Sequence, residues 1–375
     1  MENLHLKKTP LYEEHLKLNA RMVPFTGWNL PVQYSQLVEE HQCVRKNVGI
    51  FDVSHMGEFT CEGRGSSEFL QTVTINDISK MEIGHAQYNA ICNEKSGVID
   101  DIIVYKRGFD SYFICVNASN IEKDFLWLQS HLPKQGVSLT DVSNDYAQIA
   151  IQGPKSFEIL KKIVDIQAQN LKYYHFTEGK ILGVPSLIAR TGYTGELGYE
   201  IYIPSNSSSK IWRTILEIGQ AFNLKPCGLG CRDTLRLEMG YLLYGNDMDE
   251  NVSAIECGLS WITKLDKGNF IGKSAILQQK ELNHYRRLVG FEMLDKSVGR
   301  HGYLVYADLE STNSIGVITS GSPSPTLGKN IGYCLVDKDF SSLNKEVYIQ
   351  IRNDRKKAKI VKKTFYTNGT ANNEI

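Results

Sequence analysis

The chain has 375 residues, of which 42% are hydrophobic and 22% are charged, with 42 basic and 42 acidic side chains. This length indicates two or three domains, and the balanced charge argues against a protein that binds nucleic acid. No stretch approaches the ~18–20 apolar residues that span a bilayer, and the N-terminal residues resemble neither a signal peptide nor a transit peptide, so we expect a cytoplasmic protein.

The N-terminal part of the chain changes from helical to strand patterns near residue 50. Residues 41–48 look helical, and Gly49 offers the C-cap that such a helix favours. Short runs rich in β-branched and aromatic residues follow. We expect strands at residues 57–62, 88–92, 102–105 and 112–116, the last two forming a hairpin.

The next segment is expected to be a helix that begins at Ser119, where Ser119 and Glu122 have the spacing of a capping box. Its apolar stripe has helical spacing, and Pro133 ends it. A second block of strands and helices starts near Tyr146, and from about Leu288 the chain has strand patterns without a convincing helix. Because strands and helices do not alternate strictly, we predict an α+β fold with antiparallel sheets and a separate all-β C-terminal domain.

The eight cysteines are scattered, mostly among apolar neighbours, and form no CxxC motif. Cys227 and Cys231 are the one close pair, and no histidine lies near enough in sequence to complete a zinc site. We therefore expect reduced, mostly buried thiols and no metal. The sequence also contains no dinucleotide fingerprint and no Walker A motif, which argues against nucleotide binding.

Asp100 and Asp101 lie directly before the predicted strand 102–105. Because strand side chains alternate between faces, only one of the two points the same way as Ile103 and Tyr105. A carboxylate that faces inward needs a charged or hydrogen-bonding partner, so the pair marks a candidate site. Paired aspartates are also common as turn residues, and the residues alone leave both readings open.

Arg232 and Arg236 are four residues apart in a predicted helix that follows a glycine-containing loop, so they share one helix face. Arginine suits a bidentate grip on a carboxylate or on a planar ring that carries amides. A ladder of salt bridges with Asp233 and Glu238 is the alternative that spacing alone favours. The basic tail at residues 352–363 is typical of a solvated edge strand, or of a surface that meets an acidic partner.

Short motifs lie along nearly the whole chain, at residues 9–12 (TPLY), 51–58 (FDVSHMGE), 100–101 (DD), 116–120 (VNASN), 152–154 (QGP), 190–196 (RTGYTGE), 228–233 (GLGCRD), 244–249 (YGNDMD) and 324–328 (SPTLG). Taken in this order, they resemble the motifs of the glycine cleavage system T-protein (aminomethyltransferase) family. Each motif alone is a weak signal, but the ordered set is specific.

The resemblance implies three domains in a ring around a central folate cavity. We expect residues 1–50 together with 145–280 to form a discontinuous α+β domain, residues 51–144 a second α+β domain, and residues 281–375 an all-β domain like a jelly roll or barrel. The implied activity is transfer of a one-carbon unit from aminomethyl-dihydrolipoyl H-protein to tetrahydrofolate. The products are 5,10-methylene-tetrahydrofolate, ammonia and dihydrolipoyl H-protein.

The same resemblance implies tetrahydrofolate as a co-substrate and the lipoylated H-protein as a partner, with no metal, flavin, nucleic acid or membrane involved. Asp101 matches the acidic residue of the family near the reacting folate nitrogens, and Arg232 matches the arginine at the cavity. The other positions that match folate contacts, some of them loosely, are Met56, Tyr88, Asn117, Tyr193, Glu200 and Tyr241.

One departure and one alternative stand beside this interpretation. Thr367 occupies the position where the family commonly has an arginine that faces the glutamate tail of folate. Either Lys362, Lys363 or another residue of the tail supplies the charge instead, or the folate tail is held more weakly. The alternative is a folate-binding paralogue without transferase activity, of the iron–sulfur assembly type. Residues 267–273 lack the cysteine of that group and argue against it.

Overall fold

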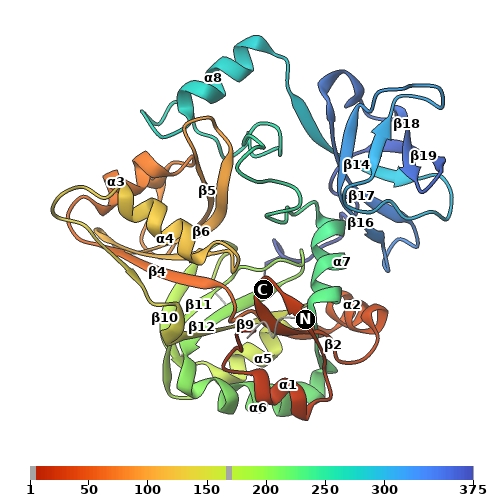
Figure 1. Cartoon of the computed structure of the whole chain (residues 1–375). Helices are drawn as coiled ribbons and strands as arrows, with labels where there is room; N and C mark the ends of the chain where they lie inside the picture. The colour runs from red at the N-terminus through yellow and green to blue at the C-terminus, as the bar shows by residue number, and fades with distance from the viewer. Residues whose placement is uncertain (1–5, 166–170, 375) are drawn as a thin grey trace.

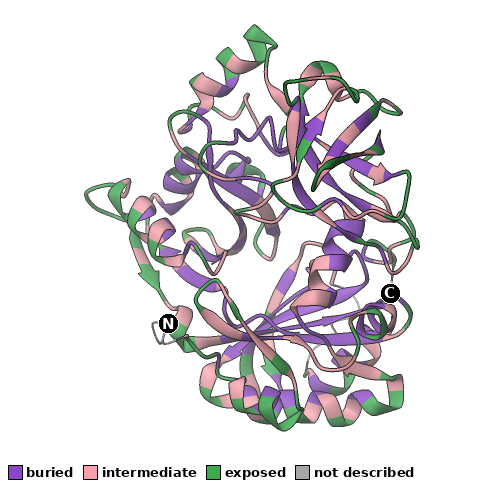
Figure 2. Cartoon of the chain, turned by 45° about the vertical axis from the view of Figure 1, so that its right-hand side comes forward, coloured by how far each residue is buried: buried purple, intermediate pink, exposed green. Residues whose placement is uncertain are grey.

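The strands of the protein form three large β-structures and one small hairpin. The computed structural model describes residues 6–165 and 171–374. A six-stranded sheet, a five-stranded sheet and a closed barrel lie around the centre of the molecule (Figures 1 and 2). The hairpin consists of β1 (Arg21–Phe25) and β2 (Trp28–Gln33). The predicted α+β fold with an all-β C-terminal domain is confirmed.

The six-stranded sheet combines an N-terminal strand with strands that come after the whole five-stranded sheet. Strand β3 pairs with β9, which brings the two segments together. All the paired strands are antiparallel except β3 and β13, which are parallel, so the expectation of purely antiparallel sheets was wrong at this edge. In order across the sheet, the strands are β10 (Phe176–Ile181), β11 (Val184–Ala189), β12 (Gly198–Pro204), β9 (Tyr146–Gln152), β3 (Val48–Asp52) and β13 (Leu224–Pro226).

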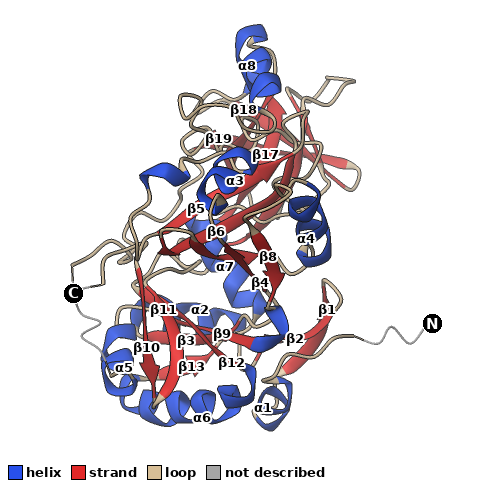
Figure 3. Ribbon diagram, turned by 90° about the vertical axis from the view of Figure 1, so that its left-hand side faces the viewer, coloured by secondary structure: helices blue, strands red, loops and turns tan. Residues whose placement is uncertain are grey.

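Helices α5 (Ser156–Ile163) and α6 (Ser208–Gly219) cover one face of this sheet (Figure 3). Ile159 of α5 and Trp212 of α6 are fully buried there and pack against Ile201 of β12 in one apolar core. The helices form because their apolar residues recur three or four positions apart and make one continuous stripe. The other helices beside the sheet are α1 (Tyr12–Lys17), α2 (Leu37–Lys46) and α7 (Leu229–Met239).

The five-stranded sheet has helices on one face and the six-stranded sheet on the other. Its helix-covered face packs Ile102 and Val104 against Leu128. On the opposite face, Tyr105 contacts Tyr202 of the six-stranded sheet, with the hydroxyl oxygens 3.0 Å apart. In order, the strands are β5 (Ala86–Cys92), β6 (Val98–Gly108), β7 (Ser111–Val116), β4 (Gly57–Glu62) and β8 (Ser138–Asp141), and the helices are α3 (Ser66–Val73) and α4 (Ile121–Ser130).

The C-terminal strands close into a barrel whose core contains Phe291, Ile318 and Val336. Strand β19 pairs on both sides, with β14 and β18, so the basic tail is not a free edge as its composition suggested. The strands are β14 (Arg286–Met293), β15 (Leu304–Tyr306), β16 (Gly316–Pro323), β17 (Asn330–Asp337), β18 (Glu346–Ile351) and β19 (Asp354–Val361), and α8 (Lys273–Leu282) precedes them.

Two local expectations at helix ends were wrong. The helix expected over residues 41–48 is α2, which ends at Lys46 because Val48 and Gly49 belong to the buried strand β3. The capping box at Ser119 is absent, since α4 begins after Asn120 and that side chain makes no cap hydrogen bond. Asn120 instead donates to Asp100, which shows that a long-range contact took precedence over the local one.

The predicted domain boundaries stay a prediction, and the boundary after residue 50 falls inside β3. Within the described residues, no helix is long and apolar enough to cross a membrane.

Candidate functional site

Asp100 and Asp101 lie inside β6, rather than before it, and point to opposite faces of the five-stranded sheet. Asp101 is half-buried on the face that carries Ile103 and Tyr105, as predicted from alternation. Its Oδ2 accepts a hydrogen bond from the Tyr88 hydroxyl (3.0 Å), and its Oδ1 accepts one from Asn117 Nδ2 (2.8 Å). Burial and the neighbouring Asp100 raise the pKa of the Asp101 carboxyl to about 7.

Asp100 is fully buried and has a different set of partners. Its Oδ2 accepts from the backbone N–H of Asn117 (2.9 Å), and its Oδ1 accepts from Asn117 Nδ2 (2.9 Å) and Asn120 Nδ2 (2.6 Å). These contacts bind β6 to the segment before α4, so the role of Asp100 is structural and its side chain does not face solvent. Asn117 touches both carboxylates and thereby fixes their relative orientation.

Tyr88 connects Asp101 to an exposed tryptophan that sequence reasoning missed. The Tyr88 and Trp261 rings are stacked, with centroids 6.0 Å apart and planes 17° apart. Trp261 is 64% exposed, an unusual position for so large an apolar ring. Its place in a segment of loops after α7 gave no periodic pattern that could have marked it. The two rings form an aromatic surface beside the Asp101 carboxylate.

Arg232 faces a second aromatic pair. Its guanidinium lies 4.6 Å from the centroid of the Tyr193 ring, and Tyr193 stacks on Tyr241 with centroids 5.8 Å apart. Tyr193 also donates its hydroxyl proton to the backbone oxygen of Leu242. Among the described residues, the half-buried Arg232 side chain has no hydrogen bond or ion pair. The alternative predicted from the spacing was a ladder of salt bridges. The salt bridges here belong to Arg236 instead, whose guanidinium nitrogens lie 2.8 Å from carboxylate oxygens of Asp233 and Asp247.

Glu200 is a buried carboxylate on β12 with neutral partners. Its Oε2 accepts from the Thr191 hydroxyl (2.6 Å), and its Oε1 accepts from Gln148 Nε2 (3.3 Å). Burial raises the pKa of Glu200, while Thr191 and the charge of Arg232 oppose the rise. Met56 packs nearby, at the junction of the apolar clusters that contain Tyr105 and Phe51.

Electrostatic coupling links the residues contributed by the two sheets and α7. Burial raises the pKa of Tyr193, and the Asp101 carboxylate raises it further, whereas Arg232 opposes the rise. The same arginine, together with burial, lowers the pKa of His55 to about 4 and keeps this buried imidazole neutral. Beside His55, Ser54 donates its hydroxyl proton to the backbone oxygen of Gln148 (3.2 Å).

The lysines expected to replace an arginine near Thr367 lie apart. Lys363 is half-buried and donates from Nζ to the backbone oxygen of Cys257 (3.2 Å), and burial lowers its pKa. Lys362 is exposed and lines a cavity of about 290 Å³ on the barrel, together with Lys329 and Phe365. Their role toward a folate tail stays a prediction.

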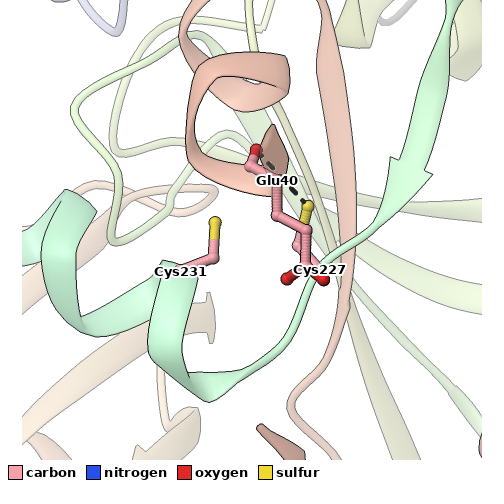
Figure 4. Close-up of side chains that lie close together, drawn as sticks. All are labelled: Glu40, Cys227 and Cys231. Carbon is pink, nitrogen blue, oxygen red and sulfur yellow. Dashed lines mark hydrogen bonds between the residues drawn. The ribbon is translucent and has the colours of Figure 1, made fainter. Parts of the chain in front are cut away.

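Glu40, Cys227 and Cys231 have potential ligand atoms within 4.8 Å of one another (Figure 4). However, Glu40 already accepts from two backbone N–H groups of the turn before α2 (2.6 and 2.8 Å) and from Gly228 N–H (2.9 Å). Burial raises the pKa of both thiols, whereas metal ligation requires thiolates. The cluster therefore holds the start of α7 against α2. All eight cysteines are free and buried, as expected.

Comparisons with known proteins give one consistent result. The family model described as "GCVT N-terminal domain" matches residues 11–267, and "Glycine cleavage T-protein C-terminal barrel domain" matches residues 286–367. Three relatives named aminomethyltransferase, from Thermoanaerobacter sp. (strain X514), Caldanaerobacter subterraneus subsp. tengcongensis and Chloroherpeton thalassium, are 46%, 47% and 48% identical. Each alignment covers 96% of this chain and 96–99% of the relative.

A solved structure is also similar over nearly its full length. The crystal structure of glycine cleavage system aminomethyltransferase T from Bartonella henselae has a TM-score of 0.91 and 28% sequence identity. The match covers 97% of this chain and 99% of that one.

Proposed function

The chain belongs to the glycine cleavage T-protein family of aminomethyltransferases, and we propose that it moves the one-carbon unit of aminomethyl-dihydrolipoyl H-protein to tetrahydrofolate. The products are 5,10-methylene-tetrahydrofolate, ammonia and dihydrolipoyl H-protein. The observation that carries this proposal is Asp101, because a half-buried carboxyl with a pKa of about 7 can both accept and donate a proton near neutral pH.

The chemistry requires a group with these properties. The methylene carbon leaves the lipoyl sulfur and loses ammonia, while it gains bonds to N5 and N10 of the folate. Loss of ammonia creates an electron-poor iminium centre, which the ionised Asp101 stabilises electrostatically. Proton transfer at the folate nitrogens by the same carboxyl contributes ~10²–10⁴-fold to the rate. Tyr88 and Asn117 hold the carboxyl in one orientation for both tasks.

The remaining matched residues are proposed to hold the folate. A pterin edge presents adjacent donors, which the two oxygens of Glu200 can accept. No acceptor among the described residues bonds to the donors of Arg232, so they remain available for the acceptors of a bound ring. Tyr193 and Tyr241 supply aromatic faces beside it. Cytoplasmic location and the absence of a metal or flavin stay predictions.

A reconstituted assay with aminomethylated H-protein and tetrahydrofolate tests the proposal. Asp101→Asn is expected to lower the rate of methylene-tetrahydrofolate formation by about 10²–10⁴-fold while folate still binds, because the amide keeps the shape but not the charge or the proton transfer. Asp110→Asn, in the exposed turn after β6, is the matched control and should leave the rate unchanged. Normal turnover of Asp101→Asn would show that the assignment is wrong.

No observation favours the alternative function, a folate-binding paralogue without transferase activity. The similar relatives are named aminomethyltransferase, and Asn269 stands in the stretch where the iron–sulfur assembly relatives are expected to carry a cysteine. The reconstituted assay separates the two functions directly, since a protein that only binds folate releases no ammonia.

A further inference from the structure

Helix α4 places a third acid behind the Asp100–Asp101 pair. Asp124 lies on the helix face that carries the apolar stripe, and its side chain is fully buried. Among the described residues, no hydrogen-bond donor reaches either of its carboxyl oxygens. Its backbone N–H donates to the Asn120 carbonyl (2.7 Å), and the Asn120 side chain donates to Asp100 (2.6 Å), so one residue connects the two acids. A buried carboxyl group without donors is costly when it is ionised, so this position requires a proton.

The contacts show which member of the pair carries that proton. Asp100 accepts three hydrogen bonds, two from Asn117 and one from Asn120, and these stabilise a negative charge. Asp124 accepts none. The proton therefore lies on Asp124, which donates it to Asp100. The pKa values agree with this direction, because burial and then the Asp100 charge raise the pKa of Asp124 well above its usual range.

The influence of the pair reaches Asp101 along two routes. Asn117 Nδ2 donates to both Asp100 Oδ1 (2.9 Å) and Asp101 Oδ1 (2.8 Å), so the position of one carboxylate fixes the other. The Asp100 charge also acts directly on its neighbour in the strand. We propose that Asp124 is a positioning residue for one-carbon transfer, which keeps Asp100 charged and in place and thereby sets the orientation and electrostatic surroundings of Asp101.

Lys123 lies next to the Asp100–Asp124 pair but forms its hydrogen bonds and its ion pair with other residues. Lys123 precedes Asp124 on α4, and its Nζ donates to the Ile99 backbone oxygen (2.8 Å) and the Tyr244 hydroxyl (2.7 Å). It also pairs with Glu250 at 3.2 Å. The titratable groups that act on the pair are thus Asp101 from the sheet, Lys123 from α4 and Tyr244 from the segment after α7.

The proposal rests on the proposed role of Asp101, so its test needs a readout besides activity. We suggest titration of the Asp101 carboxyl by carbon-detected NMR in the free protein, together with the pH profile of kcat/KM. Asp124→Asn keeps a donor for Asp100 and should leave the Asp101 midpoint near 7. Asp124→Leu removes the donor, so Asp100 takes up a proton, and the Asp101 midpoint should fall by about one pH unit.

The limb of the pH profile that belongs to Asp101 should move with the NMR midpoint in Asp124→Leu and stay in place in Asp124→Asn. An unchanged midpoint in a folded Asp124→Leu protein, or equal shifts in both variants, would overturn the proposal. If the leucine variant does not fold, Asp100→Asn removes the charge directly, and an unchanged Asp101 midpoint there would overturn it as well. If Asp101→Asn is fully active, the proposed function fails, while the NMR midpoints still test the pair.

Discussion

Two clusters of charged side chains meet at α7, and they are built in opposite ways. Around Glu238, the buried carboxylate oxygens are fully occupied by donors from other elements. Around Asp101 and Arg232, the charged groups are half-buried, and within residues 6–165 and 171–374 the guanidinium of Arg232 has an aromatic ring but no hydrogen-bond acceptor as a partner. The saturated cluster can hold the fold together, and the unsaturated one retains hydrogen-bonding capacity for a ligand.

The saturated cluster connects three parts of the molecule. Glu238 Oε2 accepts from Arg45 Nη2 of α2 (2.8 Å). Its Oε1 accepts from Ser324 Oγ (2.5 Å) and Thr326 N–H (3.0 Å), both in the turn after β16 of the barrel. Arg45 continues the network to Glu196 Oε1 (2.8 Å), beside the six-stranded sheet. The cluster therefore sets how the barrel sits against α2 and α7.

The two clusters also give opposite dependences of stability on pH. Burial alone would raise the pKa of Glu238, but His41, Ser324 and Arg45 lower it to about 2. Its contribution to stability is present above its unfolded pKa and is lost as the pH falls toward 2. The pKa of Asp101 is raised to about 7, so its contribution is full below its unfolded pKa and is lost as the pH rises through 7.

The largest expected effect comes from breaking the saturated cluster. Glu238→Ala leaves Arg45 buried without its main partner, so the free energy of unfolding should fall by about 3–5 kcal/mol. Urea unfolding followed by circular dichroism measures the change. Glu217→Ala, at an exposed position of α6, is the matched control and should change stability by less than ~0.5 kcal/mol. A loss no larger than that of the control would remove the distinction between the clusters.

The unsaturated cluster should respond in the opposite direction. Asp101→Asn removes a carboxylate whose ionisation the fold disfavours, so at pH 8 the protein should become more stable by about 1–3 kcal/mol even though activity is lost. The gain should disappear below about pH 4, where both proteins carry a neutral group. Unfolding curves at both pH values check this, and a gain that persists at pH 4 would point to packing instead of charge.

Sequence reasoning went far in the site because strand alternation is a strict local rule. Alternation placed Asp101 on the face of Ile103, as the structure has it, but left open which aspartate faces the site, and the family resemblance selected Asp101. Sequence reasoning missed Trp261, which lies among loops without periodicity and acquires its position only through Tyr88. It also passed over Asp124, although a charged residue within an apolar helix stripe is a local anomaly.

The fold could be predicted from the sequence about as well as the site, and for similar reasons. Runs of β-branched and aromatic residues located four strands of the five-stranded sheet, β4 to β7, because burial in a sheet favours such residues. The parallel pairing of β3 with β13 and the end of α2 depend on contacts between distant segments, which no local pattern records. The role of Asn120 is a further example, since Asp100 competes for its side chain.

A smaller effect is expected from Arg232→Met, which keeps much of the side-chain length but removes the donors. If those donors bind the folate, the KM for tetrahydrofolate should rise about tenfold, equivalent to ~1.4 kcal/mol. The free energy of unfolding should change by less than ~0.5 kcal/mol, because none of the residues that the structure describes loses a hydrogen bond or ion pair. Steady-state kinetics and urea unfolding measure the two quantities. Arg213→Met, on the exposed side of α6, controls for loss of a positive charge.

An effect of similar size is expected at the rim of the saturated cluster. The Thr370 hydroxyl donates to Glu196 Oε2 (2.6 Å) and accepts from the Leu197 N–H (2.9 Å), which ties the segment after the barrel to the six-stranded sheet. Thr370→Val keeps the shape and removes both bonds, so the free energy of unfolding should fall by about 1–2 kcal/mol.

Thr367→Val is the control for this last change, because Thr367 is exposed and three residues away. Its effect should stay below ~0.5 kcal/mol. If both variants lower the free energy of unfolding by the same amount, the contact between Thr370 and Glu196 does not stabilise the protein, and the saturated cluster ends at Arg45. If only Thr370→Val loses stability, and the loss disappears when Glu196 is replaced by Gln in the same protein, the cluster extends from the barrel turn through Glu238, Arg45 and Glu196 to the last residues of the chain.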